Sequence, residues 1–253
     1  MNLICFASCF ANELPVATAE FPPFKFVDKG SQKITGSDTE IIAAVFKSIG
    51  IQPKISMLPF KRADKLTRDG KFAAYYTFTK NSKREKEYLF SDPISSVQDV
   101  LFKSKSLNLS WKKYADLANR SLGYSEQYNY DQDFLSAIKD KSPIASENPE
   151  EQLLTMLQGK RFDMIICEVS VCSYIILKNS KRFSAIDYFD RPIGIPEPRP
   201  FYLGFSKKWP NAEKLRDKFN VALKKWASQP SKPRRSIFKK YGAHCARQLF
   251  PEC

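Results

Sequence analysis

Histidine is almost absent from this chain: among 253 residues the only one is His244. No two cysteines have the Cys-x-x-Cys spacing of a zinc site, so no metal centre is expected. Serine–histidine and cysteine–histidine catalysis would both have to use His244, which lies near the C-terminal end. The scarcity of histidine therefore argues against these catalytic classes, and we expect no catalytic residues, no metal and no cofactor.

Long apolar runs are also lacking. No stretch reaches the roughly 18–20 apolar residues that a membrane-spanning helix needs. The chain is 43% hydrophobic and 27% charged, a composition typical of soluble globular proteins with a real core. Its length fits one large domain or two small ones.

Acidic residues are outnumbered, with 27 Asp and Glu against 41 Lys and Arg, which gives a net charge of +14. Such a balance fits a nucleic acid, an anionic membrane surface or an anionic ligand. The basic residues are spread along the chain, however, and no basic motif of a nucleic-acid-binding module is present. We therefore interpret the charge as a generally basic surface and expect no nucleic-acid partner.

The first eleven residues contain an apolar stretch and several small residues, and no Lys or Arg precedes the apolar stretch. We interpret residues 1–11 as a short secretory leader that is cleaved after Ala11. An alternative is that Phe6 to Cys9 forms a lipobox, in which case Cys9 carries a lipid anchor. Four cysteines follow the leader, an even number in an oxidising compartment. They allow Cys167 to pair with Cys172 and Cys245 with Cys253, but spacing leaves the pairing open.

The stretch from Gly70 to Pro93 carries the first functional pattern. Residues 72–78 are apolar and aromatic, which predicts a buried strand, and a polar turn over 79–84 ends in Arg84. Open α/β sheets bind ligands beyond the carboxyl ends of their strands. Arg84, together with free backbone N–H groups of a following helix, would form an anion site, because a guanidinium donates two parallel bonds to a carboxylate.

The second half of the chain repeats this design. A helix that begins at Pro149 stops at Gly159, and the apolar strand over 164–168 ends in Glu168. One half thus presents a cation, Arg84, and the other an anion, Glu168. Facing each other across a cleft, these two groups would suit an α-amino acid, whose two charges each need a partner once they leave water.

These elements resemble the bacterial family 3 extracellular solute-binding proteins, the periplasmic receptors of polar amino-acid ABC importers. Four features in this order carry the resemblance, which spans roughly residues 14–242. They are the aromatic-Pro-Pro-aromatic turn at 21–24, the turn at 79–84, the Phe-Ser-Asp-Pro at 90–93, and Asp163 followed by Glu168.

The resemblance implies an α/β fold of two lobes, that of the type II periplasmic binding proteins. Each lobe would have a central sheet flanked by helices, and a two-segment hinge would join them. Lobe one would be discontinuous, over residues 12–103 and 199–253, with lobe two inserted over 104–198. It further implies a monomeric periplasmic receptor that captures an amino acid by hinge closure and delivers it to an ABC permease.

The resemblance also assigns roles to individual residues. Arg84 would hold the α-carboxylate within the turn that Thr79 and Asn81 complete, and Glu168 would hold the α-amino group. Phe21 and Phe60 would face the ligand side chain, and Tyr128 would reach the ligand carboxylate from the second lobe; these seven positions form the predicted site. The chain departs from the family pattern in having Asn81 where Thr is usual and Glu168 where Asp is usual.

Several alternatives compete with these assignments. Arg84 could form a surface ion pair with Glu85 or Glu87, and Glu168 could stabilise the start of the following helix. Phe21 could belong to the core, and Phe60 could be a helix staple residue. At the level of function, the alternatives are a sensor for a separate signalling partner and a dehydratase or lyase in which Glu168 is the acid or base.

Overall fold

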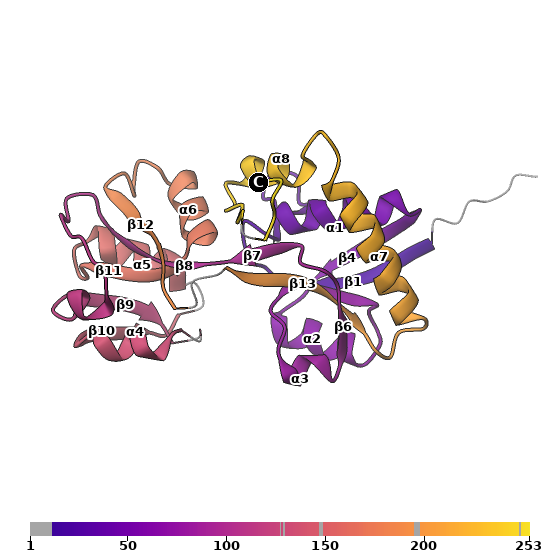
Figure 1. Ribbon diagram of the computed structural model, residues 1–253, viewed down its shortest axis with the longest axis horizontal. Helices are drawn as coiled ribbons and strands as arrows, with labels where there is room; N and C mark the ends of the chain where they lie inside the picture. The colour runs from indigo at the N-terminus through magenta and orange to yellow at the C-terminus, as the bar shows by residue number, and fades with distance from the viewer. Residues whose placement is uncertain (1–11, 127, 129, 147–148, 195–197, 248) are drawn as a thin grey trace, which may run out of the picture. The chain divides into compact units, whose positions relative to one another are not determined.

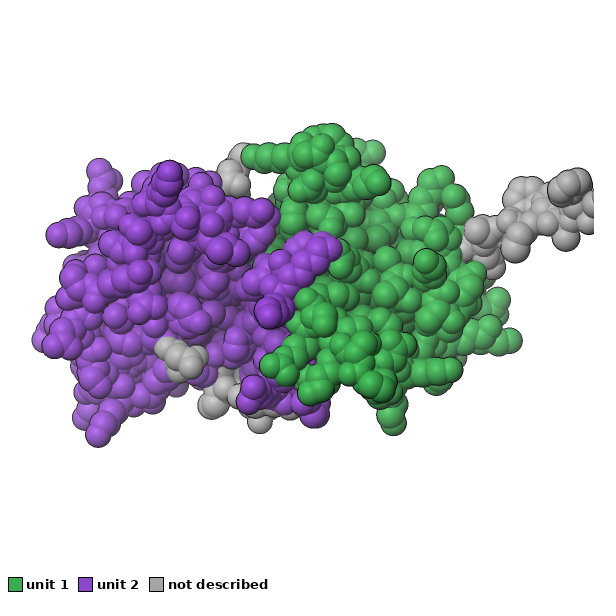
Figure 2. All heavy atoms as spheres, turned by 90° about the horizontal axis from the view of Figure 1, so that it is seen from above, with its two compact units in different colours: residues 1–95, 201–237, 252 green, residues 96–200, 238–251, 253 purple. Residues whose placement is uncertain are grey.

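The computed structural model describes residues 12–126, 128, 130–146, 149–194, 198–247 and 249–253. The chain divides into two compact units, coloured separately in Figure 2. Unit 1 comprises residues 1–95, 201–237 and 252, and unit 2 comprises residues 96–200, 238–251 and 253. The expected leader, including Cys9, lies outside the described residues.

The sheet of unit 1 has the strand order β4-β1-β5-β13-β6. The first three strands are parallel, because β1 pairs in parallel with both β4 and β5, whereas β13 pairs antiparallel with β5 and β6. Their bounds are β1 Asn12–Thr18, β4 Ile51–Met57, β5 Ala74–Phe78, β6 Tyr88–Phe90 and β13 Arg199–Ser206. Every residue of β5 is buried, which explains why its sequence is apolar and aromatic on both faces, with Thr77 as the exception, rather than alternating.

Helices cover both faces of this sheet: α1 and α7 contact each other on one side and α2 packs on the other (Figure 1). They span α1 Ser37–Ser48, α2 Phe60–Arg68 and α7 Ala212–Ala227. The helical spacing of Ile41, Val45 and Phe46 puts them on the buried face of α1, where Phe46 meets Phe219 of α7 with 4.9 Å between ring centroids.

The sheet of unit 2 has the order β10-β9-β11-β8-β12, with β9, β10 and β11 parallel and β8 antiparallel to its two neighbours. Their bounds are β8 Asp99–Ser104, β9 Ser121–Ser125, β10 Asp140–Ile144, β11 Met164–Glu168 and β12 Ile186–Pro192. Alternate residues of β11 enter two separate clusters: Ile165 packs with Leu153 on one face, and Ile166 packs with Phe134 on the other. The uninterrupted apolar run of β11 follows from this double burial.

The remaining elements are shorter. In unit 2, α5 and α6 contact β11, and α4 packs against η1. The bounds are β2 Phe26–Val27, β3 Ile34–Thr35, α3 Ser82–Glu85, β7 Ser95–Val97, η1 Tyr114–Leu117, α4 Gln132–Ala137, α5 Pro149–Gln158, α6 Val169–Lys178 and α8 Pro233–Tyr241. Within the described ranges, no helix is both long and apolar enough to span a bilayer.

The division into units differs from the expected lobe boundaries in two places. Strand β8, expected at the end of lobe one, belongs to unit 2 because it forms the central antiparallel ladder between β11 and β12. Residues 238–251, expected in lobe one, also group with unit 2, where the backbone N–H of His244 donates to the Ser170 hydroxyl. Disulfides join Cys167 to Cys172 and Cys245 to Cys253, the two pairs that the spacing allowed.

Candidate functional site

In unit 1, predicted site residues follow the carboxyl ends of all three parallel strands. β1 ends at Thr18, β4 at Met57 and β5 at Phe78, and parallel strands place these ends at one edge of the sheet. The loops that follow carry Phe21, Phe60 and the turn containing Arg84. This is the edge at which open α/β sheets bind ligands.

The Arg84 side chain is held in a fixed position by the turn that precedes it. Its Nη1 donates to the carbonyl oxygen of Thr79 at 2.6 Å and to the Thr79 hydroxyl at 3.1 Å. The guanidinium lies over the Phe78 ring, 4.8 Å from its centroid. The hydrogen bonds use only Nη1, and the Phe78 ring covers only one face of this half-buried guanidinium. The other N–H donors can therefore reach an anion.

Asn81 shapes this turn as the cap of the helix that follows it. Of the backbone N–H groups at the start of α3, that of Arg84 is taken by the Asn81 side chain, which caps the helix by accepting it at 2.9 Å. The backbone N–H of Glu85 is bound by the Asn81 carbonyl. The Glu85 carboxylate pairs with Lys80 at 3.0 Å rather than with Arg84. Neither Glu85 nor the cap therefore engages the guanidinium, which remains the charged donor of the turn.

The two predicted aromatic residues differ in their surroundings. Phe60, the first residue of α2, is 46% exposed, and its ring meets that of Tyr75 edge-on at 5.9 Å. Tyr75 in turn meets Phe78 at 5.0 Å, so an unbroken aromatic contact links Phe60 to the ring beneath Arg84. Phe21 is half-buried and stacks on Phe24 at 5.5 Å, which is closer to the core alternative.

A buried polar cluster beneath this edge was not predicted. Lys25, only 2% exposed, donates through Nζ to the Tyr75 hydroxyl at 3.0 Å and to the Tyr76 carbonyl at 2.8 Å. Burial lowers the pKa of Lys25 to about 7. Nearby Asp38 accepts from the Thr77 hydroxyl at 2.6 Å, and burial raises the Asp38 pKa to about 6. A lysine between Phe24 and Phe26 was the sequence signal for this cluster.

In unit 2, Glu168 ends β11 and is also the N-cap of α6. Its Oε2 accepts the backbone N–H of Val171 at 2.8 Å, and Oε1 accepts that of Gln98 at 3.3 Å. The side chain is 8% exposed, and burial raises its pKa to about 8 despite these two bonds. The capping alternative is therefore realised, and a carboxylate has about four lone-pair sites, more than these two bonds use, with which it could accept a ligand ammonium.

Further polar groups lie at the same edge of unit 2. The Tyr128 hydroxyl donates to Glu150 at 2.5 Å, and the Tyr128 ring, 43% exposed, meets Tyr130 edge-on at 6.2 Å. Asp99, which is the strand partner of Glu168, pairs with Arg199 at 2.5 Å. Sequence reasoning predicted Tyr128 but missed Glu150 and Asp99, because no motif marks them.

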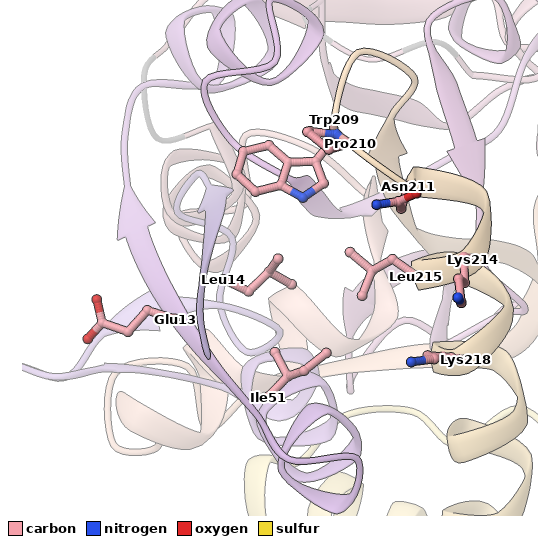
Figure 3. Close-up of a pocket in the computed structure, with 9 residues that line it drawn as sticks. All are labelled: Glu13, Leu14, Ile51, Trp209, Pro210, Asn211, Lys214, Leu215 and Lys218. Atoms are coloured by element: carbon pink, nitrogen blue, oxygen red, sulfur yellow. The ribbon is translucent and has the colours of Figure 1, made fainter. Parts of the chain in front are cut away.

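A pocket of about 390 Å³ opens at the opposite edge of the unit 1 sheet (Figure 3). It lies where β1 and β4 begin, between Leu14 and Ile51 on one side and Trp209 and Leu215 on the other. None of the seven predicted residues lines it. Since ligands of open α/β sheets bind at the carboxyl edge, this pocket is separate from the candidate site. Across the described residues, no group of three or more acidic, His or Cys side chains is arranged to hold a metal ion.

Comparisons with known proteins identify the family and the fold. The model of the bacterial extracellular solute-binding proteins, family 3, matches residues 14–242. The L-cystine-binding protein TcyA of Bacillus subtilis is 24% identical over 205 residues, covering 81% of this chain and 72% of that protein.

Two solved structures share the fold. The L-cystine solute receptor of Neisseria gonorrhoeae, in its unliganded open conformation, has a TM-score of 0.71 at 21% identity, covering 96% of this chain and 94% of that one. A Salmonella typhimurium periplasmic binding protein with high arginine specificity has a TM-score of 0.65 at 22% identity, covering 91% of this chain and 99% of that one.

Proposed function

Because the chain belongs to the bacterial extracellular solute-binding proteins of family 3, we propose that it is the receptor of an amino-acid ABC importer. It captures an amino acid by closure of its two units on the ligand and delivers it to a membrane permease. The family comprises binding proteins rather than enzymes, in line with the expectation from the resemblance. We further propose that the chain is exported to the periplasm as a monomer.

The observation that carries the ligand class is the presence of a guanidinium at one strand end and of a carboxyl group at the other. Arg84 offers guanidinium donors above a Phe78 platform and would bind the α-carboxylate. Glu168 offers a buried carboxylate at the end of β11 and would bind the α-amino group. Phe60 and Tyr128, both more than two-fifths exposed, would contact the ligand side chain, and Phe21 would support them.

A thermal-shift screen of residues 12–253 against the common amino acids, L-cystine and a few dicarboxylates tests this proposal. A ligand at ~100 times its Kd adds about 2.7 kcal/mol to the free energy of unfolding. We expect stabilisation by one amino-acid class and loss of that shift in Arg84→Ala. Arg182→Ala is the matched control, because Arg182 is an arginine of unit 2 engaged in an exposed pair with Glu151. Absence of a shift with every amino acid would contradict the proposal.

A further inference from the structure

The strand that leads to Arg84 contains a bulge at Thr77. Pairing between β5 and β13 shifts register there, since Tyr76 is opposite Leu203 and Phe78 is opposite Tyr202. Thr77 also has a positive φ of 61°, which is rare for a β-branched residue and costs about 1–3 kcal/mol unless its surroundings fix it. Something in unit 1 must therefore hold this residue.

Two buried charged side chains hold Thr77 from opposite ends. Lys25 Nζ donates to the Thr77 carbonyl at 3.3 Å and to the Tyr76 carbonyl at 2.8 Å. The Thr77 hydroxyl donates to Asp38 Oδ2 at 2.6 Å, and the same oxygen accepts from Ser95 at 2.7 Å. The bulge is thus fixed at its carbonyl by a cation and at its side chain by a carboxylate.

The two clamping residues are themselves joined through the backbone. The backbone N–H of Asp38 donates to the Phe24 carbonyl at 2.9 Å, directly before Lys25. Gly36 makes this approach feasible, because a Cβ at that position would lie 2.4 Å from the Phe24 carbonyl oxygen. Lys25 and Asp38 therefore belong to one connected structure with the proline turn, and their contacts with Thr77 are not independent of each other.

The residues directly after the bulge form the platform of the candidate site. Phe78 lies beneath the Arg84 guanidinium, and the Thr79 carbonyl accepts a hydrogen bond from Arg84 Nη1. Lys25 also binds the hydroxyl of Tyr75, whose ring contacts both Phe78 and Phe60. A shift of the bulge would move the ring and the acceptors that fix Arg84.

We propose that Lys25 is a positioning residue for ligand binding: by holding the Thr77 bulge, it places Phe78 and Thr79, and through them Arg84, to receive the ligand carboxylate. Lys25 does not touch the ligand. This inference rests on the proposed function, because it assumes that Arg84 binds a carboxylate. Its structural half, the fixed bulge, does not depend on any ligand.

The test compares Lys25→Met, which keeps the length of the side chain and removes its N–H donors, with Val45→Ala. Val45 is fully buried in α1 of the same unit, so its truncation lowers stability without touching the bulge. Calorimetry would measure the Kd of L-arginine and L-cystine and of their carboxamides, in which the carboxylate is replaced.

We expect Lys25→Met to weaken binding of the amino acid about tenfold, the effect of about 1.4 kcal/mol of lost preorganisation. Binding of the carboxamide should change less than twofold, because the carboxamide does not use the aligned guanidinium. Val45→Ala should leave both affinities within twofold. A folded Lys25→Met variant with unaltered affinity, or one that loses affinity for both compounds alike, would overturn the inference.

Hydrogen–deuterium exchange separates this inference from the proposed function. In Lys25→Met we expect faster amide exchange over residues 76–85, and in Val45→Ala no change confined to that segment. Unchanged exchange there would overturn the inference even if no ligand binds. Should Lys25→Met not fold, Thr77→Val releases the same bulge from the Asp38 side. We then expect the same two results, weaker binding of the amino acid but not of the carboxamide and faster exchange over residues 76–85. If Arg84→Ala leaves binding unchanged, it is the proposed function that fails.

Discussion

The carboxyl ends of β5 and β11 lie at equivalent positions in the sheets of two similar α/β units, yet one leads to a basic group and the other to an acidic group, and each group is held in a different way. Strand β5 bulges at Thr77 and passes into a turn, where Arg84 is held by one threonine and lies over one ring. Strand β11 passes directly into α6, and Glu168 is at once the last strand residue and the helix cap.

In unit 1 the proposed ligand-binding residue contributes little to stability, whereas in unit 2 one residue would serve both ligand binding and stability. The Arg84 guanidinium is half-buried and contacts Thr79 and the adjacent Phe78 ring, so little of the fold depends on it. The Glu168 carboxylate is buried and binds two backbone N–H groups, one from α6 and one from Gln98 before β8. Substitutions at the two positions should therefore have different consequences.

The largest expected effect is that of Arg84→Ala on ligand affinity. Removing one partner of a hydrogen-bonded charge pair costs about 2–5 kcal/mol of binding free energy. The free energy of unfolding should change by no more than about 0.5 kcal/mol, as for other surface substitutions. Calorimetric titration and urea unfolding measure the two quantities, and a large loss of stability would show that the turn is also a structural element.

Proton release should distinguish Glu168 from Arg84. Because the free protein keeps a proton on Glu168 below about pH 8 and an ammonium ligand requires the carboxylate, binding releases that proton. Affinity should therefore rise as the pH increases toward 8, by up to about tenfold per pH unit. Titrations in buffers of different ionisation enthalpy measure the release, which Glu168→Gln should abolish. Equal release in that variant would assign the proton to another group.

The capping role of Glu168 gives a smaller effect on stability. Glu168→Ala should lower the free energy of unfolding by about 0.5–2 kcal/mol, because α6 loses its N-cap. Glu168→Asn should recover most of that loss, since Asn is a good N-cap residue, while ligand affinity stays low because the charge is gone. Recovery of affinity with Asn would mean that the ligand does not need the carboxylate.

The smallest effect is expected at Phe60, whose ring is 46% exposed. Phe60→Ala should cost less than about 1 kcal/mol of binding free energy, and it should change the order of preference among amino acids more than the affinity for the best one. Ranking the same amino acids by Kd for the variant and the original protein measures this. An unchanged ranking would remove Phe60 from the ligand-facing set.

Much of the fold could be predicted from local patterns. The apolar runs before Arg84 and Glu168 predicted the two central strands, because strands buried on both faces are apolar throughout. The capping by Asn81 and the pairing of Lys80 with Glu85 depend on turn geometry that the sequence does not specify. Lys25 and Asp38 were missed since buried charged residues look like surface residues until their long-range partners at Thr77 and Tyr76 are known.

The placement of β8 in unit 2 could likewise not be predicted from the sequence. A strand of this composition could have joined either sheet, and its pairing is decided by partners about 60 residues further along the chain, at Met164–Glu168. Glu168 was predicted as a ligand group, with the start of the following helix as the alternative, because a carboxylate directly before a helix suits either. Only the cap is visible in the bonds to Val171 and Gln98.

The central claim is that Arg84 binds the α-carboxylate of the ligand. Its most direct test is a cycle that combines the substitution Arg84→Ala with the replacement of the ligand carboxylate by a carboxamide. The wild-type protein and the Arg84→Ala variant would each be titrated with L-arginine or L-cystine, whichever binds, and with the carboxamide of that amino acid. If Arg84 binds the α-carboxylate, the two changes remove the same interaction, so Arg84→Ala should weaken binding of the amino acid strongly and binding of the carboxamide hardly at all. Equal losses for the two compounds would show that Arg84 acts elsewhere and would contradict the account.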